Sequence, residues 1–252
     1  MIIKIIRALG TGFFFSFFGI GALMIGTICF PFIDLFCKKP RPKKNIIKLN
    51  LVRQTWRFFL YLLSITHLAK LRLENFPSTP VKSSIIIANH PSLLDVVFMI
   101  STFKNSSCII KSSLRKNIFL YFLIKDIYIF NDDPLETIID KSRVLLENEA
   151  NIIVFPEGTR TIPGNPTRLH KSFILIAHKT SHNILPVHIS QSFPVLHKHQ
   201  PWYDVGDRCV VYNLKVLPYI NVSNYNQGTT RQIVTSIKED VIKTLYSSNI
   251  QI

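Results

Sequence analysis

The stretch "IIIANHPSLLD", from Ile85 to Asp95, joins a short apolar run to a histidine and supplies an acid five residues later. Three isoleucines and an alanine in succession are typical of a fully buried strand. Pro91 disfavours helical backbone at His90 and fits the first position of a helix. The stretch therefore predicts a strand that ends at Asn89 or His90, then a turn, then a helix that carries Asp95 about one turn from its start.

The predicted turn decides whether His90 and Asp95 can meet. Within one regular helix, residues five apart point roughly 140° away from each other, because each residue turns by about 100°. With His90 in the turn, the Asp95 carboxylate can reach back to one imidazole nitrogen and leave the other nitrogen free. This arrangement predicts a general base, as in a Ser-His-Asp triad without the serine. The alternative is a satisfied histidine at a strand end, with Asp95 exposed.

A second apolar strand, in the stretch "IIVFPEGTR" at residues 152–160, ends in a polar turn. Gly158 allows the backbone to turn sharply. Thr159, Arg160 and nearby backbone N–H groups can hold a phosphate, which a guanidinium binds bidentately. A surface loop with a solvated arginine is the alternative reading. Two cations further along the chain could extend this anion site: Arg168 and Lys171.

Basic residues gather in the same part of the chain as the apolar ones. The chain has 252 residues, a net charge of +15 and 47% hydrophobic residues, and residues 1–72 hold 12 Lys and Arg against a single acid. Residues 8–33 contain no charge, and about 20 such residues can cross a bilayer. Cations beside apolar segments suit an anionic membrane surface better than a nucleic-acid groove. We therefore expect membrane lipids as partners, and no nucleic acid.

Three segments form the expected N-terminal membrane anchor, residues 1–74. Residues 8–33 are predicted to be an embedded helix, whose five glycines leave open whether it spans the bilayer or bends within one leaflet. Residues 37–44 are a basic linker, which the positive-inside rule places on the cytoplasmic side. Residues 46–72 are predicted to be an interfacial helix with Trp56 at headgroup level, and a core helix of the soluble domain is the alternative.

Beyond a turn-rich boundary at 75–80, short apolar runs alternate with amphipathic ones. The predicted strands are 84–88, 108–111, 127–130, 151–155, 184–189 and 209–216. The predicted helices are 92–103, 113–125, 134–149, 169–180 and 229–246, and Asp133 is expected to cap the third of them. This alternation predicts a layered α/β domain over residues 75–252.

Two histidines, His178 and His182, stand four apart in a predicted helix, a spacing that can bind zinc. Lys179 stands where the metalloprotease pattern needs a glutamate. A polar helix face is therefore the preferred interpretation, and no metal site is expected. The four cysteines are scattered without a C-x-x-C pair, which argues against a disulfide framework.

The motif "NHPSLLD", followed about 60 residues later by "FPEGTR", closely resembles the glycerolipid acyltransferase family, in particular the lysophosphatidic acid acyltransferases. The resemblance runs from about residue 45 to 219. The stretch "ILPVHI" at 184–189 is similar to the family's fourth block, and the apolar N-terminus is similar to the two-helix membrane anchor of bacterial members. The resemblance implies an α/β layered fold with such an anchor, at the bacterial inner membrane with the catalytic domain on the cytoplasmic side.

The resemblance also implies a role for each matching residue. His90 would deprotonate the hydroxyl of a lysolipid acceptor and Asp95 would orient His90. The hydroxyl would then attack the thioester of acyl carrier protein or coenzyme A without an acyl-enzyme. Pro186 would shape the acyl or thioester pocket. No cofactor or metal is implied beyond the acyl-thioester co-substrate. Three residues of the second motif would bind the acceptor's glycerol phosphate: Glu157, Gly158 and Arg160.

The sequence also departs from the family pattern. The family's second block ends in a glycine and then a phosphate-binding arginine, where this chain has Asn131, Asp132 and Asp133. A phosphate beside two carboxylates is disfavoured unless a cation intervenes. This departure favours a different acceptor, and "KSSLRKNIF" and "PWY" resemble bacterial members from aryl-polyene or related lipid clusters. A catalytically silent, lipid-binding membrane protein is the rival of another class.

Overall fold

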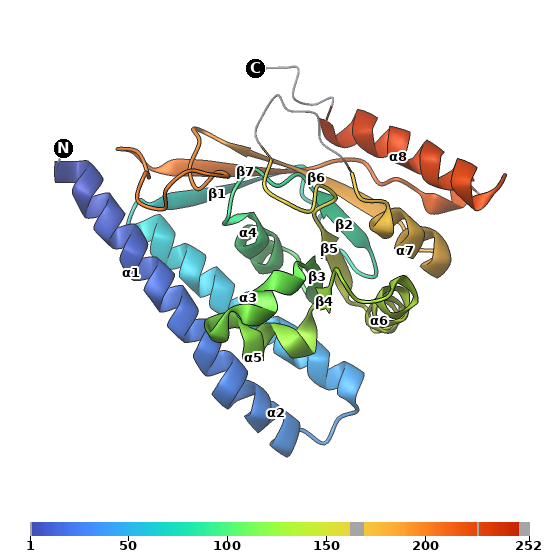
Figure 1. Cartoon of the computed structure of the whole chain (residues 1–252), viewed down its shortest axis with the longest axis horizontal. Helices are drawn as coiled ribbons and strands as arrows, with labels where there is room; N and C mark the ends of the chain where they lie inside the picture. Colours follow the sequence, from blue (N-terminus) through green and yellow to red (C-terminus); the bar gives the residue numbers. More distant parts are fainter. Residues whose placement is uncertain (1, 162–168, 226, 247–252) are drawn as a thin grey trace.

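The computed structural model describes residues 2–161, 169–225 and 227–246. A seven-stranded sheet in the order β1-β7-β6-β2-β5-β3-β4 forms its centre (Figure 1). The predicted α/β class is confirmed. The strands are β1 (Ala69–Glu74), β2 (Ile85–Ala88), β3 (Ser106–Ile110), β4 (Ile129–Phe130), β5 (Asn151–Val154), β6 (Ile184–Gln191) and β7 (Val210–Val216).

Strand direction brings the two sequence motifs to one edge of the sheet. The strands β6, β2, β5, β3 and β4 are mutually parallel, while β7 is antiparallel to β6 and β1 is parallel to β7. Because the five parallel strands end at the same edge, the residues that follow β2 and β5 are neighbours there. In open α/β sheets this carboxyl edge is where ligands bind.

Helices cover both faces of the sheet (Figure 1). One face carries α1, α3, α4 and α5, and the other carries α6, α7 and α8. The central strand β2 serves both cores, because successive side chains point to opposite faces: Ile86 packs in the first core, and Ile85 and Ile87 pack in the second. The helices are α1 (Ile2–Met24), the π-helix η1 (Ile25–Cys29), α2 (Phe30–Phe36), α3 (Arg41–Ile65), α4 (Asp95–Thr102), the 3₁₀-helix η2 (Ser112–Lys116), α5 (Ile118–Ile127), α6 (Leu135–Glu147), α7 (Ser172–Thr180), the 3₁₀-helix η3 (Val222–Tyr225) and α8 (Thr230–Tyr246).

The first three helical segments form one continuous apolar helix over residues 2–36, which runs along a flank of the molecule (Figure 1). It is longer than the helix predicted at 8–33. Its most apolar window has a mean hydropathy of 2.1. Within the described parts of the chain, it is the single helix whose length and composition suffice to cross a membrane.

The predicted helix at 46–72 is wrong at its C-terminal end. The helix α3 stops at Ile65, the backbone turns at His67 with φ of 55°, and residues 69–74 form the edge strand β1. The sheet therefore begins before the expected boundary at 75–80. The basic linker is also shorter than predicted, because α3 already begins at Arg41.

Trp56 does not lie at an exposed, headgroup-facing position of α3. Its side chain is 4% exposed and stacks on Phe18 of α1, with ring centroids 4.3 Å apart. The buried face of α3 (Leu49, Val52, Trp56, Phe59 and Leu63) belongs to the same core as the sheet. The alternative of a core helix therefore describes α3 better than an interfacial helix does.

Candidate active site

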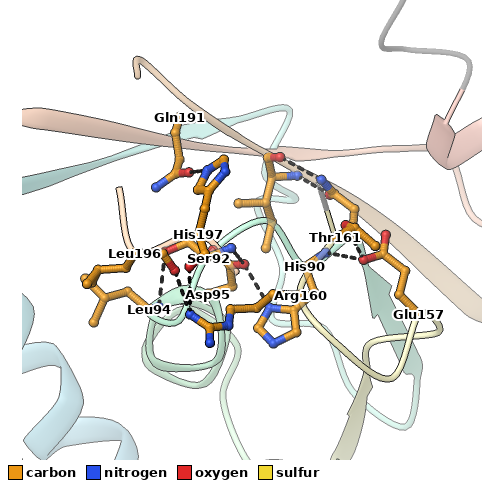
Figure 2. A network of polar contacts seen from close by, with 12 residues as sticks. His90, Ser92, Leu94, Asp95, Glu157, Arg160, Thr161, Gln191, Leu196 and His197 are labelled. Atoms are coloured by element: carbon orange, nitrogen blue, oxygen red, sulfur yellow. Dashed lines mark hydrogen bonds and ion pairs between the residues drawn. The ribbon is translucent and has the colours of Figure 1, made fainter. Parts of the chain in front are cut away.

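The structure brings His90 and Asp95 into contact at the carboxyl edge of the sheet (Figure 2). His90 Nδ1 lies 2.9 Å from Asp95 Oδ2. Asp95 is the first residue of α4 and is fully buried. The backbone N–H of Ser92 donates to the same carboxylate oxygen at 2.6 Å. The predicted contact is therefore present, and the turn at Pro91 makes it possible.

Burial and hydrogen bonding act in opposite directions on Asp95. Loss of solvent raises the pKa of its carboxyl, while the hydrogen bonds from His90 and from the Ser92 N–H lower it. Asp95 Oδ1 has no hydrogen-bond partner among the described residues. A hydrogen bond from His90 to this carboxylate places the ring proton on Nδ1 and leaves Nε2 as the basic nitrogen.

The His90 ring is held on its flat side by the second motif. Its centroid lies 4.4 Å from that of Phe155, with 31° between the ring planes. The His90 side chain remains 15% exposed, whereas Asp95 has no exposed surface. The histidine is therefore the member of the pair that a reacting group can approach.

Two buried hydroxyls brace the turn, and sequence reasoning missed both. Ser92 Oγ lies 2.9 Å from the Tyr212 hydroxyl, which extends from β7 across the core. Burial raises the pKa of the Tyr212 phenol well above its usual value, so it stays protonated. Nothing in the sequence marks Tyr212 as more than an ordinary strand aromatic, because its partner lies 120 residues away.

The buried side chain of Glu157 joins three segments by hydrogen bonds. Its Oε2 accepts hydrogen bonds from the His90 backbone N–H at 3.1 Å and from Thr161 Oγ1 at 2.6 Å. Its Oε1 accepts from the Tyr246 hydroxyl, at the end of α8, at 2.8 Å. Both oxygens are thus engaged within the protein, and direct contact of Glu157 with the acceptor stays a prediction. Sequence reasoning missed Tyr246, which lies 89 residues away.

The polar turn after β5 folds over the His90 turn. Gly158 has φ of +63°, and a Cβ there would lie 2.8 Å from His170 Nε2. Both the left-handed backbone and the close side chain require glycine at this position. The backbone N–H of Thr161 donates to the carbonyl of His90 at 2.9 Å, which joins the two motifs directly.

Arg160 is held by the connection between β6 and β7, residues 192–209 (Figure 2). Its Nη1 donates to the carbonyls of Leu196 at 2.9 Å and His197 at 3.1 Å. His197 in turn contacts Gln191 at the end of β6. Arg160 is therefore a half-buried cation fixed beside the His90 turn, and the neighbouring Thr159 is half-buried as well.

Two further predicted binding residues, Lys171 and Pro186, lie apart from this cluster. Lys171 is exposed just before α7, and Arg168 lies outside the described residues. Pro186 is buried in β6, paired with Ile87. By strand alternation it shares the face that α7 and α8 cover. No hydrogen bond or ring contact among the described residues joins Lys171 or Pro186 to His90.

Cations neutralise the two aspartates that replace the family arginine. The Arg115 guanidinium pairs with Asp132 at 2.6 Å and with Asp133 at 3.1 Å, and it stacks on the Phe130 ring at 3.8 Å. Lys141 adds an ion pair with Asp133 at 2.6 Å. Hydrogen bonding from Arg115 holds the pKa of Asp132 below its usual range. The charges of Arg115 and Lys141 are therefore balanced by Asp132 and Asp133.

The same ion pairs correct one prediction. Asp133 does not cap α6, because its carboxylate is directed to Arg115 and Lys141, and Pro134 occupies the capping position without a side-chain hydrogen bond. Among the residues that the structure describes, no group of three or more His, Cys, Asp or Glu lies close enough to hold a metal ion. His178 and His182 belong to no such group.

Comparisons with known proteins find similarity in sequence and in fold. The sequence model of the Acyltransferase family matches residues 70–190. A 1-acyl-sn-glycerol-3-phosphate acyltransferase of Cocos nucifera is 29% identical over 114 residues, which cover 41% of this chain and only 36% of that enzyme. The crystal structure of the 1-acyl-sn-glycerophosphate acyltransferase PlsC from Thermotoga maritima has the same fold, with a TM-score of 0.67 at 23% identity over 95% of both chains. Residues 70–190 are therefore similar in sequence to the Acyltransferase family, and the chain as a whole shares the fold of PlsC.

Proposed function

We propose that this protein moves a fatty acyl group from the thioester of acyl carrier protein or coenzyme A to a hydroxyl of lysophosphatidic acid or a related lysolipid. The single observation that carries the proposal is the 2.9 Å contact between His90 Nδ1 and Asp95 Oδ2, beside the loop that holds Arg160. The family match supports transfer of an acyl group in general. The finer assignments of donor and acceptor belong to the proposal.

His90 acts as the general base in this mechanism. Its Nε2 takes the proton from the acceptor hydroxyl while the oxygen attacks the thioester carbonyl carbon. The new C–O bond forms, the C–S bond breaks, and the departing thiolate takes the proton back from His90. Asp95 stabilises the imidazolium that exists between these two proton transfers. A base positioned in this way supplies roughly 10²–10⁴-fold of rate.

Substitution of the base tests the proposal directly. Purified His90→Ala is expected to lose transfer by at least about 10²-fold, since the substitution removes the proposed general base. The measurement is the formation of diacyl product from a radiolabelled acyl donor, supplied in separate arms as acyl carrier protein or coenzyme A thioester. His178→Ala, in α7 and away from the dyad, is the matched control. Transfer that survives in His90→Ala contradicts the assignment of the base.

A second candidate acceptor is a specialised lysolipid that lacks a phosphate, as the replaced family arginine suggests. Arg115 lies beside the residues that replace this arginine, but its guanidinium is ion-paired with Asp132 and Asp133. We expect the phosphate requirement to be weak if those carboxylates stay paired with it. Competing lysophosphatidic acid against an uncharged monoacylglycerol of the same chain length measures the preference. A strong preference for the phosphate in this competition contradicts the second candidate.

The apolar helix over residues 2–36 supports a place at the membrane, where a lysolipid acceptor and its product reside. We propose the bacterial inner membrane, with the catalytic domain on the cytoplasmic side where thioester donors are made. The basic residues that follow the helix support this orientation under the positive-inside rule. Protease accessibility of the β6–β7 connection in sealed inside-out and right-side-out vesicles tests it.

A further inference from the structure

Two segments far apart in the sequence pack along the same flank of α1. Gly12, Gly19 and Gly26 recur every seven residues, which is close to two helical turns, so they share one side of the helix. A Cβ on Gly12 would lie 3.1 Å from the Trp202 ring, and one on Gly19 would lie 3.7 Å from the Phe119 side chain. At Gly26, the backbone of α5 itself touches the helix.

These segments also expose large apolar side chains next to their contacts with α1. Trp202 is 50% exposed and Tyr203 is 58% exposed, although Trp202 also packs edge-on against Phe15. At the start of α5, Ile118 is 69% exposed and Phe119 is 43% exposed. We call this set the rim: Trp202, Tyr203, Ile118, Phe119, Tyr121 and Phe122.

The rim lies on both sides of the candidate active site. In the sheet order, β6 and β3 flank the central pair β2 and β5, whose ends carry His90 and Glu157. The connection with Trp202 leaves the carboxyl edge after β6, and the segment with Phe119 leaves the same edge after β3. The two exposed apolar segments therefore frame the edge at which His90 lies.

We propose that the rim is a membrane-docking surface, which seats the mouth of the active site on a phospholipid bilayer so that the acceptor approaches His90 between Trp202 and Phe119. The identity of the acceptor in this inference rests on the proposed function. The choice of a bilayer as the partner rests on the exposed surface alone. The occupant is a bilayer because the rim adjoins the exposed apolar stripe of α1, which includes Leu9 and Phe13.

The chemistry of the rim suits the boundary between water and lipid. Trp and Tyr concentrate at the headgroup level of membranes, because one end of the ring is apolar and the other can be hydrated. Lys125 lies over the Tyr121 and Phe122 rings at 5.6 and 5.0 Å, so its charge can stay near the headgroups while its stem covers the rings. Exposed Lys116 precedes the same helix.

Tryptophan fluorescence tests the docking, because the chain has two tryptophans and Trp56 is buried in the core. The full chain is reconstituted in vesicles of phosphatidylcholine and phosphatidylglycerol, with or without acyl chains brominated near the headgroup. We expect the brominated chains to quench the emission of the wild type and most of that quenching to disappear in Trp202→Phe. Equal quenching in both proteins, with Trp202 accessible to aqueous iodide, overturns the proposal.

A kinetic measurement separates docking from a general loss of folding. Trp202→Asp and Phe119→Asp are expected to lose transfer to a vesicle-embedded acceptor severalfold more than transfer to a short-chain, water-soluble acceptor. Tyr219→Asp is the matched control, because this exposed tyrosine follows β7 at the opposite edge of the sheet. If the two acceptors are affected equally, the rim does not dock. If no acceptor is turned over at all, the proposed function fails while the fluorescence result still decides the docking.

Discussion

At the scale of single residues, Asp95 carries a conflict between stability and activity. A carboxyl whose pKa is raised on folding binds its proton more tightly in the folded state. Its contribution to stability therefore grows as the pH falls through that raised pKa, and at neutral pH the ionised form costs stability relative to a neutral side chain of the same size. The protein retains this buried carboxyl at the place where the proposed mechanism forms an imidazolium.

Asp95→Asn separates the two effects. We expect acyl transfer to fall by roughly 10³–10⁴-fold, because an amide no longer fixes the reactive His90 tautomer. Thermal stability at pH 7 should be equal to or higher than that of the wild type. The checks are initial rates with a saturating thioester donor and the unfolding midpoint in the same detergent. A variant that loses stability in proportion to its activity would mean that Asp95 is structural.

At the scale of elements, α8 reaches the candidate active site through its last turn. The Tyr246 hydroxyl donates to Glu157, and Glu157 accepts from the backbone N–H of His90. Burial raises the pKa of Tyr246 far above its usual value, so the hydroxyl remains a donor. The position of the His90 turn thus depends on a helix that supplies none of the reacting groups in the proposed mechanism.

Tyr246→Phe tests the hydrogen bond between Tyr246 and Glu157. Removing one donor from a buried carboxylate is expected to cost about 1–3 kcal/mol of stability. We expect kcat to fall severalfold with little change in KM, since the His90 turn is displaced while the surface that binds the acceptor remains. Tyr225→Phe is the control, because it also removes a hydrogen bond from tyrosine to a carboxylate, Asp240, away from His90. Equal effects of the two substitutions on kcat argue against a positioning role.

The sequence predicted the elements that bury uniform surfaces and missed those that depend on distant partners. The strand β2 is predicted correctly, because Ile85, Ile86 and Ile87 form an apolar run that is buried on both faces of the sheet. The sequence predicts the end of a helix where the strand β1 lies. The segment "AKLRLE" forms an edge strand that pairs only with β7 and leaves most side chains exposed, so it lacks the apolar pattern of a buried strand. His90 and Asp95 could be paired from local geometry, whereas Tyr246 and Tyr212 act across more than 80 residues.

At the scale of the whole molecule, the N-terminal helix is part of the core rather than a detachable anchor. Phe14 and Phe30 of this helix belong to the same hydrophobic core as the sheet. Phe14 packs edge-on against Phe59 at 5.9 Å, and Phe18 also packs against Phe59 at 5.4 Å. The buried Lys48 of α3 holds the C-terminal end of this helix by an ion pair with Asp34 of α2 at 2.7 Å.

Removal of residues 1–40 should therefore unfold the domain instead of releasing a soluble enzyme. It uncovers large side chains that are buried against the helix, among them Trp56 and Phe59. Each costs roughly 1.5–3 kcal/mol when returned to water, and a domain has only about 5–15 kcal/mol of stability in total. The control is Leu9→Ser with Phe13→Ser, which alters the exposed stripe and leaves the buried side intact. We expect the control to unfold cooperatively and to bind vesicles more weakly, and the truncated chain to aggregate in size-exclusion chromatography. A monodisperse truncated domain with a sharp unfolding transition would show that helix and sheet fold independently.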